Sequence, residues 1–153
     1  MSLLTVADLP LLSGMSPEQL ALVEASAKKV SFVAGERVFA EGQPANSCWL
    51  LLRGCVALDV TIQGRGQVVV QTVDAGEVLG WSWLTPPYRW HFGARALEPT
   101  AAILLDTGQL RALGQQDPAF GYALAIRLLV VVLDRLQATR ARLLDLYGSP
   151  HAG

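Results

Sequence analysis

Residues 30–58 read VSFVAGERVFAEGQPANSCWLLLRGCVAL, a run of short apolar stretches separated by turn residues. Two short strands are expected on either side of Ala34–Gly35, and two more on either side of Arg53–Gly54. Further strands are expected at residues 67–73 and on either side of Glu98–Pro99. Short strands spaced in this way, with glycine-containing turns between them, are typical of a β-sandwich or barrel. The stretch therefore predicts a mainly β fold.

A helix is predicted in front of this β region, at residues 16–30. Ser16 suits the N-cap position, Pro17 suits the first helical position, and Gln19 completes a capping box. Apolar residues then recur at helical spacing up to the point where the β pattern begins.

A longer helix is predicted at the other end of the chain, at about residues 117–147. Asp117 can cap it and Pro118 can open it. A helix of about 30 residues is roughly 45 Å long, so it must project beyond a small barrel or meet a partner. Residues 128–133 are apolar all round, and burial on more than one side is expected there.

One face of this C-terminal helix carries a stripe of the kind that forms the seam of a coiled coil. We therefore expect a homodimer formed through the helix. A protein partner that binds the same helix and receives a signal is the alternative. The residues of the predicted dimer stripe are Ile126, Leu129, Leu133, Leu136, Arg140 and Leu143.

Length and composition indicate one globular domain over residues 1–153. The chain is 52% hydrophobic and 16% charged, the reverse of a disordered chain. We expect a β-sandwich or barrel at about residues 30–106, flanked by the two helices.

Charge and hydropathy exclude several classes of function. The net charge is −1, and the 12 basic residues form no run, so DNA binding within this chain is not expected. No signal peptide is recognisable, and the longest apolar stretch, Ala123–Leu133, is interrupted by Arg127 and too short for a membrane. A cytoplasmic protein is expected. Cys48 and Cys55 lie in apolar surroundings and are expected to be buried, inert thiols.

Catalysis is not expected. A metal site of the cupin kind needs two or three histidines and a carboxylate, but the chain contains only His91 and His151. No Ser-His-Asp or Cys-His arrangement can be built from these two residues, and no P-loop pattern occurs.

Four stretches, taken in order, resemble the cyclic-nucleotide-binding domain family. They are LPLLSGMSPEQLALV (9–23), the stretch at 30–58, DAGEVLG (74–80) and AILLDTGQLRALGQQDPAFGYAL (102–124). The resemblance is to the sensor domain of catabolite activator proteins, without the helix-turn-helix, and it covers about residues 9–147. It implies a double-stranded β-helix (jelly-roll) barrel, and a regulatory, non-catalytic domain that holds a small ligand inside this barrel. The glycines in these stretches are expected in turns with positive φ, at Gly35, Gly42, Gly54 and Gly76.

The resemblance also implies where a ligand binds. In the family, a glutamate just after a glycine binds the ribose, and an arginine pairs with the phosphate. Gly80 matches the glycine, but Trp81 stands where the glutamate is expected. Arg89 lies close to the arginine position, whereas counting back from Ala96 places Trp90 there.

We therefore expect a divergent phosphate-binding segment, with cyclic nucleotide binding altered or lost. The ligand is a cyclic nucleotide or another small anionic or planar molecule. The candidate ligand-binding residues are Gly80, Trp81, Ser82, Arg89 and Trp90.

Aromatic side chains gather in this segment, and three interpretations remain open. They can fill the core and close the pocket, line a pocket for a planar or cationic ligand, or form a partner surface. Arg89 needs a partner, which an anionic ligand or Glu77 can supply. His91 is expected to be packed or hydrogen-bonded, and Arg95 to lie on a solvated face or in an ion pair. The aromatic residues are Trp81, Trp83, Tyr88, Trp90 and Phe92.

Overall fold

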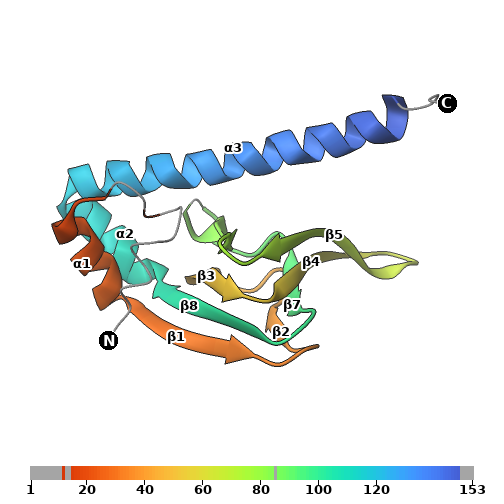
Figure 1. Ribbon diagram of the computed structural model, residues 1–153, viewed down its shortest axis with the longest axis horizontal. Coiled ribbons are helices and arrows are strands. Elements are labelled where there is room, and N and C mark those ends of the chain that lie inside the picture. Colours follow the sequence, from red (N-terminus) through yellow and green to blue (C-terminus); the bar gives the residue numbers. More distant parts are fainter. Residues whose placement is uncertain (1–11, 13–14, 85, 149–153) are drawn as a thin grey trace.

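The computed structural model describes residues 12, 15–84 and 86–148. Two four-stranded antiparallel sheets pack face to face, with three helices at one end and along one side (Figure 1). The elements are α1 (Pro17–Ala25), β1 (Ala27–Phe32), β2 (Arg37–Phe39), β3 (Ser47–Arg53), β4 (Cys55–Ile62), β5 (Gly66–Asp74), β6 (Val78–Leu79), the 3-10 helix η3 (Ser82–Leu84), β7 (Gly93–Ala96), β8 (Thr100–Asp106), α2 (Thr107–Gln116) and α3 (Pro118–Gly148).

The strand order confirms the predicted jelly-roll. One sheet has the order β1-β8-β3-β6 and the other has the order β2-β7-β4-β5, so most neighbouring strands are distant in sequence and only β4 and β5 form a hairpin. Side chains from both sheets form one apolar core. The predicted turn glycines are confirmed as well, since Gly35, Gly42, Gly54 and Gly76 all have positive φ. At Gly54, a Cβ atom would also lie 2.7 Å from the carbonyl oxygen of Pro99, which leaves no room for another residue.

The N-terminal helix is shorter than the sequence predicts. Its start is confirmed, because the Ser16 hydroxyl accepts the Gln19 N–H and the Ser16 N–H donates to Gln19 Oε1, each at 3.1 Å. The prediction of a helix to residue 30 is wrong, since α1 ends at Ala25 and Ala27–Phe32 forms β1. These residues pair along the whole length of β8, and this long-range pairing overrides their local helix propensity.

Two helices, rather than one, follow the last strand. Asp106 caps α2 by accepting the Gln109 N–H at 3.1 Å. The chain then becomes extended at Asp117, as is usual for a residue that precedes a proline. Asp117 Oδ1 accepts the N–H groups of Ala119 and Phe120 and so caps α3, whose bounds agree with the prediction to within one residue.

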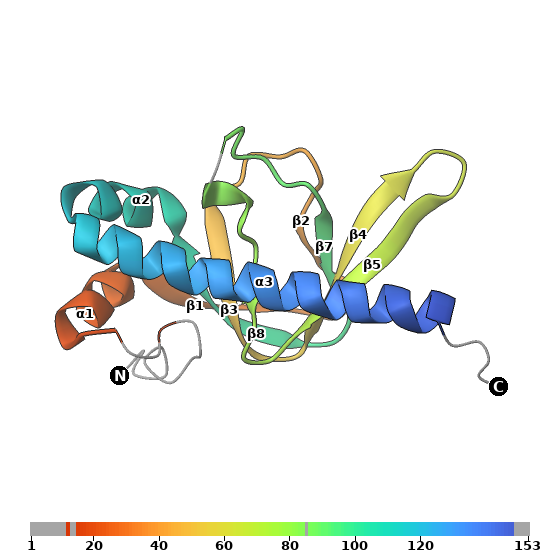
Figure 2. The same ribbon diagram turned by 90° about the horizontal axis from the view of Figure 1, so that it is seen from above.

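Helix α3 runs the length of the molecule, from α1 and α2 at one end toward the β4–β5 hairpin at the other (Figures 1 and 2). Its first half buries Phe120, Leu124 and Leu128. The expectation that residues 128–133 are buried on more than one side is wrong for the single chain, because Leu129, Val130 and Leu133 are exposed. None of the described helices combines the length and the apolarity that a bilayer crossing requires.

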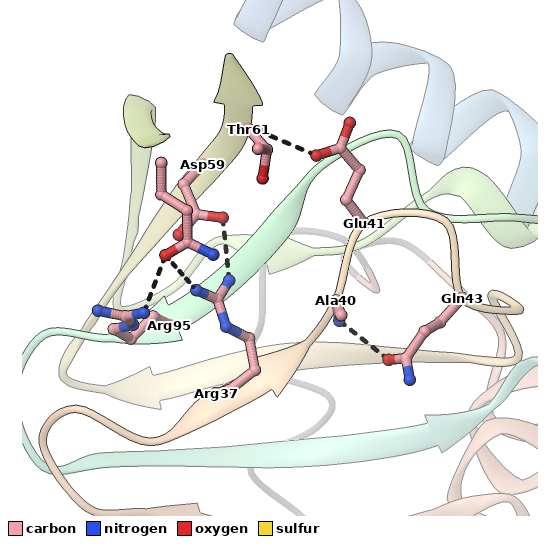
Figure 3. A network of polar contacts seen from close by, with 8 residues as sticks. Arg37, Ala40, Glu41, Gln43, Asp59, Thr61 and Arg95 are labelled. Atoms are coloured by element: carbon pink, nitrogen blue, oxygen red, sulfur yellow. Dashed lines mark hydrogen bonds and ion pairs between the residues drawn. The ribbon is translucent and has the colours of Figure 1, made fainter. Parts of the chain in front are cut away.

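A polar network ties together the strands of the second sheet (Figure 3). Arg37 Nη1 lies 2.9 Å from Asp59 Oδ1, and the guanidinium groups of Arg37 and Arg95 both donate to Gln67 Oε1. Gly93 makes room for this ion pair, since a Cβ atom there would lie 2.5 Å from Arg37 Nη1. Arg95 is thus an exposed residue with a structural hydrogen bond, in line with the expectation of a solvated strand face.

Candidate functional site

A cavity of about 260 Å³ lies beside the segment that resembles the family's ligand-binding region. Residues of both sheets and of the segment around η3 form its walls. The lining residues are Phe39, Leu58, Val73, Val78, Gly80, Trp81, Ser82, Trp90, His91 and Phe92.

Trp90 is a buried aromatic residue in the wall of this cavity. Its ring is buried and stacks on Phe39, with centroids 3.9 Å apart and an interplanar angle of 17°. The ring of Trp49 lies 6.0 Å away on the other side of the cluster. Such aromatic contacts stabilise a core beyond the burial of area alone. Trp90 therefore gives the cavity a rigid aromatic wall.

Gly80 allows this arrangement. Its φ of 93° suits glycine, and a Cβ atom at this position would lie 2.7 Å from Cη2 of Trp90. The glycine that the family pattern uses beside a ligand therefore makes space here for a tryptophan ring.

The remaining aromatic residues of the segment divide between core and cavity. Trp83 is 1% exposed, and its Nε1–H donates to the carbonyl oxygen of Gly80 at 3.1 Å. Trp81 is half-buried and Phe92 is exposed, and both line the cavity. Tyr88 lies under the guanidinium of Arg111, 4.3 Å from its ring centroid. Core filling and a pocket lining thus coexist in the aromatic cluster.

Ser82 and His91 provide the polar side chains of the cavity. Ser82 Oγ and His91 Nδ1 lie 3.2 Å apart, within hydrogen-bond distance. None of the described residues that line the cavity is a lysine, arginine, aspartate or glutamate. Apart from the indole N–H groups of Trp81 and Trp90, the polar side-chain groups of the described lining are this hydroxyl–imidazole pair.

Arg89 does not join the other four candidate residues at the cavity. Its side chain is exposed and donates from Nη1 to the carbonyl oxygen of Gly42 at 2.9 Å. Glu77, the alternative partner considered from the sequence, instead accepts the Asp74 N–H at 2.7 Å. The structure thus brings together Gly80, Trp81, Ser82 and Trp90, and places Arg89 on the surface loop beside them.

Arg135 of α3 is a residue of the site that sequence reasoning missed. Its Nη1 donates to the carbonyl oxygen of Thr72 in β5, and its Nη2 lies 3.4 Å from Glu77 Oε1. Its guanidinium carbon lies 5.8 Å from the centroid of the Trp81 ring, within the range of a cation–π contact. The spacing of the helix could have indicated that Arg135 faces the domain, since position 135 lies on the same helix face as Leu128 and Val131.

The two thiols differ in burial. Cys48 is buried as expected, and burial raises the pKa of its thiol to about 12. The expectation that Cys55 is also buried is wrong, because its side chain is only half-buried. Desolvation raises the pKa of Cys55 to about 11, and the hydrogen bond to Asp74 and the charge of its carboxylate act in the same direction.

Because the thiolate is the reactive form, we expect the folded protein at pH 8 to resist alkylation by iodoacetamide. Cys48 should stay unmodified and Cys55 should react slowly, with a rate that increases as the pH approaches 11. Both should react rapidly in concentrated urea, which serves as the control. Mass spectrometry after timed quenching measures the rates, and rapid native labelling of Cys48 would contradict its burial.

Comparisons with known proteins support the fold described above. A family model described as the cyclic nucleotide-binding domain matches residues 29–117. Among solved structures, a candidate cyclic nucleotide-binding protein from Geobacter metallireducens GS-15 superposes with a TM-score of 0.81 at 27% identity, covering 89% of this chain and 98% of that one. No curated protein matches the chain.

Two further structures extend the likeness. The catabolite activator protein of Thermus thermophilus has a TM-score of 0.69 at 25% identity, covering 90% of this chain and 62% of that one. The sensor domain of the transcriptional regulator DNR from Pseudomonas aeruginosa has a TM-score of 0.67 at 21% identity, covering 86% of this chain and 89% of that one, and shares the fold. The family match spans more than half of the residues and coincides with the β-sandwich and the cavity. The chain therefore belongs to the cyclic nucleotide-binding domain family.

Proposed function

We propose that this chain is a non-catalytic regulatory domain that senses a small ligand in the cavity and passes the signal to α3. Cyclic nucleotide binding is altered or lost, because Trp81 replaces the glutamate that the family uses for ribose and no arginine is among the described residues that line the cavity. The observation that carries the proposal is the position of Trp81, which forms part of the cavity wall and also lies under Arg135 of α3.

The path from the cavity to the helix is short. A molecule in the cavity touches one face of the Trp81 wall, and Arg135 lies over that ring while holding β5 through the Thr72 carbonyl. A ligand can shift the position of α3 only if it binds two arrangements with different affinities. A ligand that fixes or displaces the Trp81 ring would bind the two arrangements with different affinities, because Arg135 keeps its cation–π contact with this ring in one arrangement and loses it in the other.

Hydrogen–deuterium exchange across residues 129–140 tests this coupling. A panel of cyclic AMP, cyclic GMP and phenol is first tested for compounds that raise the melting temperature. We expect a stabilising compound to change α3 exchange in the unmodified protein but not in a Trp81→Leu variant, which keeps an apolar wall without the ring.

A Phe92→Leu variant is the matched control, since Phe92 also lines the cavity, and it should keep the response in α3. An unchanged α3 in the presence of a bound compound would contradict the proposal, as would a response that persists in Trp81→Leu. Failure of every compound to raise the melting temperature would also count against a sensor role.

A second proposal concerns self-association through α3. The predicted dimer stripe is solvent-exposed in the single chain, although soluble proteins rarely leave a long apolar stripe uncovered. A second copy related by a two-fold axis covers such a stripe with an identical one. Arg140 is the exposed polar member of the stripe. The apolar members are 38–50% exposed, and they are Ile126, Leu129, Leu133, Leu136 and Leu143.

Sedimentation velocity at tens of micromolar tests this proposal. We expect a dimer for the unmodified protein and a monomer for Leu133→Asp, which places a charge in the centre of the stripe. Val33→Asp, at an exposed position on the β1–β2 connection, is the control and should remain dimeric. A monomeric unmodified protein would show that α3 does not mediate self-association.

A further inference from the structure

We infer that the cavity binds an uncharged, planar aromatic molecule of one or two rings with one hydrogen-bonding group, and that it excludes anions. This inference rests on the sensor role proposed above and names the chemical class of its ligand. Four properties of the cavity carry it: its aromatic walls, its hydroxyl–imidazole pair, the engagement of the nearby arginines and its size.

The aromatic walls favour a flat molecule. Phe39 and Trp90 form one buried stacked pair, while Trp81 and Phe92 are more exposed. Aromatic faces attract other rings in offset or edge-to-face geometry, which a flexible aliphatic chain cannot exploit. The aliphatic side chains of Leu58, Val73 and Val78 complete an otherwise apolar lining.

The hydroxyl–imidazole pair of Ser82 and His91 favours a ligand with one hydrogen-bonding group. The Ser82 hydroxyl both donates and accepts, and one of these functions is directed at His91 Nδ1 at 3.2 Å. A phenol O–H or an indole N–H can use the remaining capacity of this pair. A ligand with several polar groups would leave the others without partners against apolar walls, which costs affinity.

The nearby arginines are engaged outside the cavity. Arg89 donates to Gly42 O, and Arg135 binds Thr72 O and lies near Glu77 beyond the Trp81 ring. Arg37 pairs with Asp59 on the outer face of the sheet (Figure 3). An anion entering the cavity would lose its hydration without gaining a guanidinium partner, and this favours an uncharged ligand.

The size of the cavity limits the ligand to one or two rings. An apolar cavity of about 150 Å³ in another protein holds one benzene. Sites for drug-sized ligands begin at about 300 Å³. The volume of about 260 Å³ lies between these values.

Indole and indole-3-carboxylate form a pair of probes, because they share the ring system and differ by one carboxylate group, which carries a negative charge. Titration calorimetry compares their affinities for the unmodified protein. In parallel, the Nε1–H resonances of the tryptophans in ¹⁵N-labelled protein report which rings the probe contacts. We expect saturable binding of indole, with shifts at Trp81 and Trp90, and at least about tenfold weaker binding of indole-3-carboxylate.

A cavity-filling variant localises the binding. Val73→Phe inserts a ring into the cavity and should abolish indole binding. Val69→Phe makes the same change on the same strand at a residue that is 57% exposed, and it should bind indole normally. Circular dichroism checks that both variants fold, and Val78→Phe replaces Val73→Phe if the latter does not.

The outcomes separate this inference from the sensor proposal. Tighter binding of indole-3-carboxylate, lost in Val73→Phe, would overturn the ligand class while leaving the sensor role supported. Indole binding that survives Val73→Phe would place the probe elsewhere and overturn the inference, as would a lack of indole binding to the unmodified protein. The sensor role is judged independently by the exchange of α3.

Discussion

Replacing Trp83 with alanine is expected to lower the free energy of unfolding by about 4 kcal/mol. Trp83 is 1% exposed and is one of the largest fully buried side chains in the described part of the chain. Its removal loses the burial of the ring, leaves a space that the surrounding side chains only partly fill, and leaves the carbonyl oxygen of Gly80 without the indole N–H. Urea denaturation monitored by circular dichroism measures the change.

Trp83→Phe is the matched variant for this experiment. It keeps an aromatic ring but removes the donor to Gly80, and it is expected to cost about 1–2 kcal/mol. Phe92→Ala removes an aromatic side chain that is 39% exposed and should cost less than Trp83→Ala. If Trp83→Ala cost under about 1 kcal/mol, Trp83 would not be the packing centre of the segment next to the cavity.

Replacing Phe120 with alanine is expected to cost about 3–4 kcal/mol and to loosen the attachment of α3. Phe120 is fully buried at the start of the helix, and Leu124 and Leu128 continue the same buried face. Because the later part of α3 is largely exposed, these residues supply most of the apolar contact that holds the helix against the domain. Thermal unfolding and hydrogen exchange of α3 measure the two effects.

Tyr122→Ala is the control, since Tyr122 is 71% exposed two residues further along the same helix. Its effect on stability should stay within about 0.5 kcal/mol. Equal effects of the two substitutions would show that α3 is not anchored at Phe120. The proposed coupling between the cavity and α3 would then lack the fixed helix start on which it relies.

Much of the fold can be predicted from the sequence because its strands and turns have local signals. The glycine turn at Gly54 separates two apolar stretches, and the structure has β3 and β4 there. The N-terminal helix begins at its capping box, but its end depends on pairing with β8, which lies more than seventy residues away. The two-residue strand β6 is likewise defined by its partner β3 and has no local signal of its own.

The candidate site is only partly predictable for the same reason. The resemblance places Trp81 where the family's glutamate is expected and leaves the arginine position open between Arg89 and Trp90, and both tryptophans line the cavity. The direction of the Arg89 side chain cannot be predicted from the sequence, because it is fixed by a hydrogen bond to the carbonyl oxygen of Gly42, 47 residues earlier in the chain. The contact of Arg135 with Trp81 depends on where α3 crosses the sandwich, which tertiary packing decides.

This chain keeps the family fold, and we propose that its cavity no longer suits a cyclic nucleotide. Titration calorimetry of the unmodified protein with cyclic AMP and cyclic GMP tests it most directly. We expect no saturable heat with either nucleotide at concentrations below millimolar. A micromolar dissociation constant for either nucleotide, lost on Arg89→Ala, would contradict the claim and show that Arg89 leaves Gly42 to bind the phosphate.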